Sequence, residues 1–147
     1  MEAVIFIGIQ GAGKSTFYKQ FFVDTHIRIN LDMLKTRHRE KLLLEACLKA
    51  KQPFVVDKTN ASIEERKRYI LAAKACYFRV VGYYFRSNFE ECLERNNLRR
   101  GKARVPEKGL RGFLSRFQMP SYVEGFDVLY HVRIGENREF IVTEWKE

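Results

Sequence analysis

A glycine-rich segment near the amino terminus, followed by a lysine and two hydroxyl residues, has residue types suited to binding a triphosphate. The segment comprises Gly8, Ile9, Gln10, Gly11, Ala12, Gly13, Lys14, Ser15 and Thr16. Its three glycines permit backbone angles that other residues resist, so we expect all three to turn N–H groups toward an anion. A lysine here can reach the β- and γ-phosphates of ATP, and the next hydroxyl can ligate Mg²⁺. The segment therefore predicts a Mg²⁺–ATP site, with Ser15 on the metal.

An apolar run that ends in a single carboxylate indicates whether the γ-phosphate of ATP is transferred to water or to another acceptor. Phe54-Val55-Val56 leads into Asp57, and Lys58-Thr59-Asn60 follows. An ATP-hydrolysing motor usually carries a second carboxylate beside such an aspartate, where it activates water. Because no glutamate follows Asp57, the sequence favours transfer of the phosphate to an acceptor.

Asp32 follows a short strand-like run at residues 27–30. Parallel sheets bind ligands where the carboxyl ends of their strands meet, so Asp32 is expected near such a site. A carboxylate there could accept the proton of an acceptor hydroxyl and aim its oxygen at the γ-phosphorus. Aspartate is equally suited to capping a helix N-terminus, so the residue alone leaves both interpretations open.

Arg95 and Arg99 are four residues apart on one face of an expected helix. The stretch from Arg99 to Arg116 then holds seven basic residues and one acidic residue. Arginines so placed can close over a triphosphate and neutralise charge on the transferring group, whereas a solvated helix end is the alternative. The one-sided charge favours a lid at about residues 95–116.

Composition limits the class of protein. The chain has 147 residues, of which 46% are hydrophobic, and we expect a single domain over residues 1–147. The net charge of +9 favours an anionic partner. No apolar run is long enough to span a bilayer and no signal peptide precedes the first strand, so we expect no membrane partner and a cytoplasmic location. The three scattered cysteines are expected to be reduced packing thiols.

Short apolar runs alternate with segments of helical period, which predicts an α/β fold with a parallel sheet. Strands are expected at residues 4–7, 27–30, 54–57, 78–85 and 128–132, with an antiparallel edge strand at 140–145. Helices are expected at residues 14–22, 34–51, 62–75, 88–99 and 107–118. The helix at 34–51 should bury one stripe, formed by Leu42, Leu43, Ala46, Cys47 and Ala50. Ser62 and Glu65 have the spacing of a capping box.

Taken together, the motifs resemble the kinase domain of the 5′-hydroxyl polynucleotide kinases. The matching segments are Gly8–Ser15; Ile29-Asn30-Leu31-Asp32; Val55-Val56-Asp57-Lys58-Thr59-Asn60; Arg95-Asn96-Asn97-Leu98-Arg99-Arg100-Gly101; and Pro120 with Glu124-Gly125-Phe126. The resemblance implies a P-loop kinase fold, a three-layer sandwich with a mainly parallel sheet and an arginine-bearing helical lid. It covers nearly the whole chain, and its order and spacing are more specific than its first motif alone.

The resemblance also implies a role for each matching residue. Asp32 is expected to be the general base, and Arg95 with either Arg99 or Arg100 to supply the lid arginines. The element beside the acceptor pocket would be Asp57, Thr59 and Asn60, while Lys35 or Arg39 would hold a phosphate of the acceptor. This sequence has Leu31 where the family usually has arginine, and Lys35 replaces an arginine of the phage type.

We therefore expect an ATP-dependent kinase that phosphorylates the 5′-hydroxyl end of DNA or RNA, with ATP and Mg²⁺ as cofactors. One alternative is a P-loop kinase of a small molecule such as a nucleoside, metabolite or antibiotic. Another is a non-catalytic, nucleotide-gated nucleic-acid-binding module. The phosphatase domain of the bifunctional enzymes has no counterpart in this sequence, which suggests a separate phosphatase or ligase partner.

Overall fold

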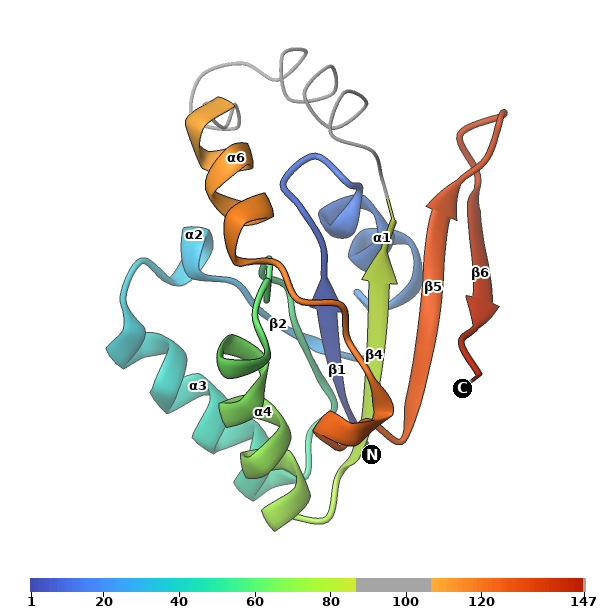
Figure 1. The fold of residues 1–147 in the computed structure, drawn as a ribbon. Coiled ribbons are helices and arrows are strands. Elements are labelled where there is room, and N and C mark those ends of the chain that lie inside the picture. The colour runs from blue at the N-terminus through green and yellow to red at the C-terminus, as the bar shows by residue number, and fades with distance from the viewer. Residues whose placement is uncertain (87–106, 147) are drawn as a thin grey trace.

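The computed structural model describes residues 1–86 and 107–146, and this part of the chain contains one six-stranded sheet (Figure 1). Its strands are β1 (Glu2–Ile7), β2 (Ile27–Ile29), β3 (Phe54–Val56), β4 (Arg79–Phe85), β5 (Val128–Ile134) and β6 (Phe140–Glu144). Their order is β2-β3-β1-β4-β5-β6, and every neighbouring pair is parallel except β5 and β6. The six predicted strands, including the antiparallel edge strand, are confirmed.

The helices of the described residues connect these strands. They are α1 (Lys14–Phe21), α2 (Leu31–Leu34), α3 (Arg37–Ala50), α4 (Ile63–Ala75), α6 (Glu107–Arg116) and the 3₁₀ helix η2 (Tyr122–Glu124). The predicted helix at 34–51 is wrong at its start, because the short helix α2 comes first and Thr36 then caps a separate α3 by accepting a hydrogen bond from the Arg39 N–H. The predicted helix at 88–99 lies outside the described residues. No helix in the described ranges is long and apolar enough to cross a membrane.

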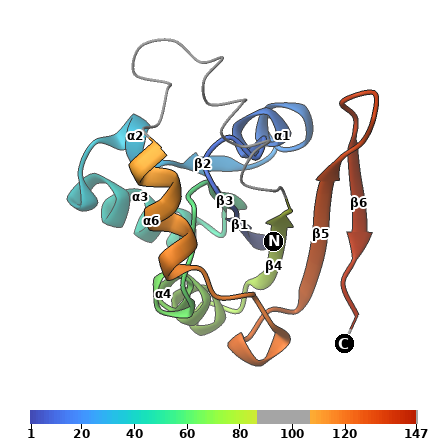
Figure 2. The same cartoon turned by 45° about the horizontal axis from the view of Figure 1, so that its top comes forward.

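The sheet separates two hydrophobic cores, because successive side chains of a strand point to opposite faces. On β1, Val4 and Phe6 pack in one core with the α1 residues Phe17 and Tyr18. Ile5 and its same-face neighbours on β1 pack in the other core, which residues of α3 and α4 complete. Figures 1 and 2 accordingly show α1 on one face of the sheet and α3 and α4 on the other. The predicted three-layer sandwich is confirmed.

The stripe predicted for α3 is wrong in part. Leu42, Ala46 and Ala50 are exposed, whereas Glu40, Cys47 and Leu48 are buried. Glu40 faces inward because its carboxylate accepts a hydrogen bond from the Tyr69 hydroxyl and forms ion pairs with Lys58 and Arg68. Burial raises the pKa of Tyr69, and its hydrogen bond to Glu40 adds to the shift. Glutamate is usually exposed, so nothing in the sequence indicated that Glu40 is buried. The buried face of the helix was therefore predicted at the wrong residues. Cys47 and Cys76 are free thiols.

Helix α4 begins as predicted, with one difference in its cap. The Ser62 hydroxyl accepts a hydrogen bond from the Glu65 N–H at 3.1 Å. The Glu65 carboxylate accepts from the N–H of Ala61 at 2.8 Å, one residue before the position expected in a capping box. Both bonds satisfy donors near the helix N-terminus, so the chain turns into α4 immediately after the loop that follows β3.

Because β1 to β4 are parallel, their carboxyl ends meet at one edge of the sheet. The segments that follow β1, β2 and β3 hold the predicted phosphate loop, Asp32 and Asp57 in turn. Figure 1 shows the loop between β1 and α1 at the same end of the sheet as α2. The topology therefore brings the candidate site residues of three segments to a common edge, where α/β proteins bind ligands.

Candidate active site

The phosphate loop, defined as residues 8–13, connects β1 to α1. Gly11 and Gly13 have φ angles of 88° and 98°, so the glycine requirement predicted for these two positions is confirmed. Gly13 is also the N-cap of α1, which directs the free N–H groups of that helix toward the loop. Gly8 is required for a different reason than predicted, since its φ is not positive. A Cβ at Gly8 would lie 2.9 Å from the Cβ of Phe85, so the close approach of β4 excludes a side chain.

Lys14 lies buried within this loop rather than extended into solvent. Its ammonium donates to the carbonyl oxygens of Gly8 and Ile9 at 2.8 and 2.9 Å. The loop is tied to the neighbouring segment by the N–H of Gly8, which donates to the carbonyl of Thr59 at 3.0 Å. Positive φ angles, the free amides of a helix N-terminus and a lysine at this position are features that suit a loop to binding an anion.

Ser15 and Asp57 lie side by side at the start of α1. The Ser15 hydroxyl donates to Asp57 Oδ2 at 3.3 Å, and the Asp57 side chain is 2% exposed. Hydroxyl and carboxylate oxygens are the ligands that Mg²⁺ prefers, and Mg²⁺ usually takes only one or two protein oxygens beside phosphate oxygens and water. The pair therefore fits a magnesium ion. No group of three or more His, Cys, Asp or Glu residues that could hold a metal ion occurs in the described ranges.

Arg28 completes this group and was missed by sequence reasoning. It extends from β2, and its Nε lies 2.8 Å from Asp57 Oδ2 while its Nη2 donates to the Ser15 hydroxyl at 2.9 Å. In the sequence it stands between the two isoleucines of a short strand. Its contacts with Ser15 and Asp57 span 13 and 29 residues of sequence, which no local pattern reveals.

Thr59 and Asn60, predicted beside the acceptor, shape the loop after β3. The Asn60 side chain is 2% exposed and donates to the carbonyl of Phe6 at 2.7 Å, with its own φ at 46°. Thr59 contributes its carbonyl oxygen to Gly8, as described above. Asn60 is thus too buried to touch an acceptor directly, and its observed contact holds this loop against β1.

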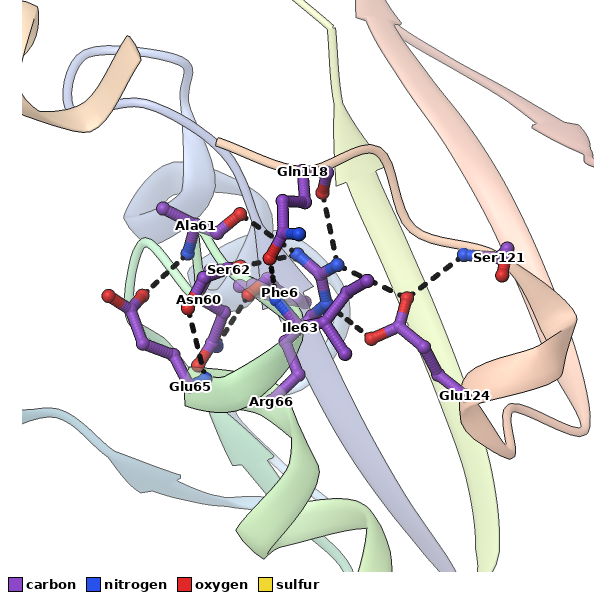
Figure 3. A network of polar contacts seen from close by, with 10 residues as sticks. All are labelled: Phe6, Asn60, Ala61, Ser62, Ile63, Glu65, Arg66, Gln118, Ser121 and Glu124. Carbon is purple, nitrogen blue, oxygen red and sulfur yellow. Dashed lines mark hydrogen bonds and ion pairs between the residues drawn. The ribbon is translucent and has the colours of Figure 1, made fainter. Parts of the chain in front are cut away.

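Arg66 on α4 fixes the same loop from below, as Figure 3 shows. The guanidinium is 0% exposed and donates to the carbonyl oxygens of Asn60 and Ala61 at 2.8 and 3.1 Å. It also forms two parallel bonds to the Glu124 carboxylate at 2.8 and 3.1 Å. Glu124 belongs to the last segment of the sequence resemblance, so this buried pair gives that segment a structural role. Arg66 itself carried no sequence signal.

Asp32 is the second residue of α2, so the alternative interpretation, that it caps this helix, is wrong. The cap is Asn30, whose side-chain oxygen accepts from the Met33 N–H at 3.0 Å. The Asp32 side chain is exposed at the carboxyl edge of the sheet. The carboxylate is therefore held on a short, capped helix and remains accessible to a ligand.

The two basic residues expected to hold an acceptor phosphate differ in their surroundings. Lys35 ends α2 with a φ of 75° and ψ of −35°, a strained conformation for a residue with a side chain. Arg39 donates from Nη1 to the carbonyl of Leu34 at 3.2 Å, which stabilises the C-terminus of α2. Both are exposed. The predicted lid arginines, Arg95 and Arg99 or Arg100, lie outside the described residues.

Residues 4–120 match the family model described as AAA domain. A bifunctional polynucleotide phosphatase/kinase of Schizosaccharomyces pombe is 36% identical over 131 residues, which are 85% of this chain and 32% of that protein. The chain thus spans about a third of the length of the curated relatives that it matches.

Two solved structures share the fold. Kti12 of Chaetomium thermophilum, solved with ADP-AlF3, superposes with a TM-score of 0.68 at 16% identity and 92% coverage of each chain. A gluconokinase of Sinorhizobium meliloti gives a TM-score of 0.63 at 17% identity, covering 92% of this chain and 83% of the other. The six-stranded α/β architecture described above is therefore the P-loop kinase fold.

Proposed function

The chain belongs to the AAA domain family, and we propose that it transfers the γ-phosphate of ATP to the 5′-hydroxyl end of a DNA or RNA strand. The observation that carries the proposal is the shared edge of the sheet. There, a complete phosphate loop and an exposed carboxylate, Asp32, follow strands separated only by β3. The 36% identity to a bifunctional polynucleotide phosphatase/kinase supports the class of acceptor.

The phosphate loop would bind the triphosphate of ATP. Its glycine N–H groups and the N-terminus of α1 would supply neutral donors, and Lys14 would supply a positive charge from inside the loop. Ser15 and Asp57 would hold Mg²⁺, which when bound would neutralise charge on the phosphate oxygens. The lid arginines, Arg95 with Arg99 or Arg100, would neutralise further charge on the transferring group.

Asp32 would act on the acceptor. In the proposed step, the 5′-hydroxyl oxygen forms a bond to the γ-phosphorus while the bond from that phosphorus to the bridging oxygen of ADP breaks. The hydroxyl proton passes to the Asp32 carboxylate, and ADP leaves with the electron pair of the broken bond. Since phosphoryl transfer has a loose transition state, orientation of the hydroxyl matters more than the strength of the base. An exposed aspartate on a short, firmly capped helix meets that requirement.

Lys35 is better placed than Arg39 to hold a phosphate of the acceptor. Arg39 already donates to the end of α2, so its role is to stabilise the helix that carries Asp32. Lys35 lies three residues after Asp32 and has a positive φ although it is not a glycine. Such strained backbone conformations often occur at functional positions. Asn60 would contribute indirectly, through the position of the loop after β3.

The experiment that tests the proposal offers ATP labelled in its γ-phosphate to several acceptors. These are a 5′-hydroxyl oligodeoxynucleotide, a 5′-hydroxyl oligoribonucleotide and a panel of small hydroxyl compounds. We expect label at the 5′ end of an oligonucleotide. Label found only on a small compound would replace the proposed acceptor by a metabolite, and absence of transfer despite ATP binding would indicate a binding module.

Asp32→Asn tests the role of the carboxylate within the same assay. We expect ATP affinity to be retained and transfer to fall by at least about a hundredfold, the usual size of general-base catalysis. Asp24→Asn is the matched control, because Asp24 is also exposed but precedes β2 at the opposite edge of the sheet. Equal transfer by the two variants would contradict the assignment of Asp32.

A further inference from the structure

Arg28 donates hydrogen bonds to an oxygen of each residue that would hold the metal. Its Nε and Nη2 both lie 2.8 Å from Asp57 Oδ2, and Nη2 lies 2.9 Å from the Ser15 hydroxyl oxygen. The same Oδ2 accepts from the Ser15 hydroxyl at 3.3 Å. The guanidinium thus donates to one oxygen of each candidate metal ligand at the same time.

Asp57 needs a counter-charge when no metal is bound. Its side chain is 2% exposed, and an ionised carboxylate at such a position is costly unless it is paired and hydrogen-bonded. Arg28 provides both the charge and the donors. The Arg28 side chain is itself 25% exposed, and its guanidinium carbon lies 5.8 Å from the centre of the Tyr18 ring. It therefore forms the rim of the site and has a path to solvent.

A divalent cation and this guanidinium compete for the same oxygens. Mg²⁺ binds oxygen lone pairs directly and tolerates little distortion of its octahedral shell. A guanidinium has five N–H donors and no acceptor, so it cannot itself become a ligand. Two cations a few ångströms apart also repel each other, most strongly where burial reduces screening.

We propose that Arg28 is a built-in competitor of Mg²⁺, which occupies Ser15 and Asp57 in the nucleotide-free protein and must move away when the metal-bound nucleotide enters. The inference rests on the proposed ATP site and adds a residue that sets its metal dependence. Arg28 keeps the site neutral and ordered without metal, and it weakens the metal-bound state. A purely structural ion pair would instead affect stability and leave the metal dependence unchanged.

The test measures the affinity of a non-hydrolysable ATP analogue twice, in excess EDTA and in saturating Mg²⁺. The dissociation constant in EDTA divided by the dissociation constant in Mg²⁺ is a ratio that reports how strongly metal and nucleotide are coupled, independently of turnover. We expect Arg28→Gln to raise this ratio about tenfold over wild type, because one opposing charge beside the divalent ion is removed. Arg79→Gln is the matched control. It removes one arginine at the start of β4, at the opposite end of the sheet, and should leave the ratio unchanged.

Arg28→Lys is the second variant and keeps the charge. A lysine cannot donate in the two fixed directions of a guanidinium, so it should pair with Asp57 and release Ser15. We expect its ratio to rise about threefold, between wild type and Arg28→Gln. Because this variant preserves the counter-charge of Asp57, it keeps the test decisive if Arg28→Gln fails to fold.

Two results would overturn the inference. A ratio in the Arg28 variants equal to that of Arg79→Gln would reduce Arg28 to a structural ion pair. A ratio below that of wild type would mean that Arg28 assists the metal. If the wild-type protein binds no nucleotide under either condition, the proposed function fails as well, and that outcome is distinct from an unchanged ratio.

Discussion

The buried pair of Arg66 and Glu124 allows a quantitative prediction for Glu124→Gln. The guanidinium is 0% exposed and forms two bonds to the carboxylate, at 2.8 and 3.1 Å. Glutamine has the same shape, but it leaves the arginine charge without its counter-ion and turns one acceptor into a donor. Breaking a buried ion pair by removing one partner costs about 3–5 kcal/mol. With a urea slope of roughly 1.5–2 kcal/mol per molar, the unfolding midpoint should fall by about 2 M.

The assay is urea unfolding of wild type, Glu124→Gln and a matched control, Glu144→Gln. Glu144 forms an ion pair with Lys146 at 3.8 Å on the protein surface, and such pairs contribute about 0–1 kcal/mol. Both variants make the same chemical change, so the difference between them isolates burial. A loss in Glu124→Gln no larger than in Glu144→Gln would refute the claim that the Arg66 network holds the loop after β3.

Two further predictions concern the loop and the acceptor. Gly8→Ala places a Cβ 2.9 Å from Phe85 and should destabilise the protein by about 1–3 kcal/mol and weaken ATP binding. Gly112→Ala on α6, whose new Cβ would make only an ordinary contact with Arg116 Nη1 at 3.6 Å, should be neutral or stabilising in the same thermal and binding measurements. Lys35→Ala should flatten the slope of log affinity for a 5′-hydroxyl oligonucleotide against log salt by about 0.7 and spare ATP affinity. Lys49→Ala, at the far end of α3, should not, and an equal effect of both would remove Lys35 from the acceptor site.

Sequence patterns predicted the fold well where local chemistry determines the structure. Helix α4 begins directly after its cap, because Ser62 and Glu65 satisfy N–H donors that lie within a few residues. The strands were predictable because β1, β3 and β4 are covered on both faces and therefore appear as unbroken apolar runs. The phosphate loop was predictable because its three glycines lie within six residues of the chain, and two of them adopt the positive φ angles that favour glycine.

Buried charges account for what the sequence did not reveal. Glu40, Arg66 and Asp57 are buried, although charged residues are seldom buried unless they are paired. Each of them is paired with residues far away in the sequence. Arg66 reaches Glu124 across 58 residues, and Glu40 reaches Tyr69 across 29. Spacing rules apply within one helix or strand, so they cannot identify a pair formed between elements. Arg28 was missed for the same reason.

The two carboxylates of the site have different surroundings, and Asn30 connects them. Asp57 is enclosed, and its Oδ2 accepts from Arg28 and Ser15, so an acceptor hydroxyl has no access to that oxygen. Asp32 is exposed on α2. Asn30 accepts from the first turn of α2 at 3.0 Å and donates to the Asp57 carbonyl at 2.9 Å. A single buried side chain therefore fixes the helix that carries Asp32 relative to the segment that carries Asp57. This arrangement supports a division of labour in which Asp57 serves the metal and Asp32 serves the acceptor.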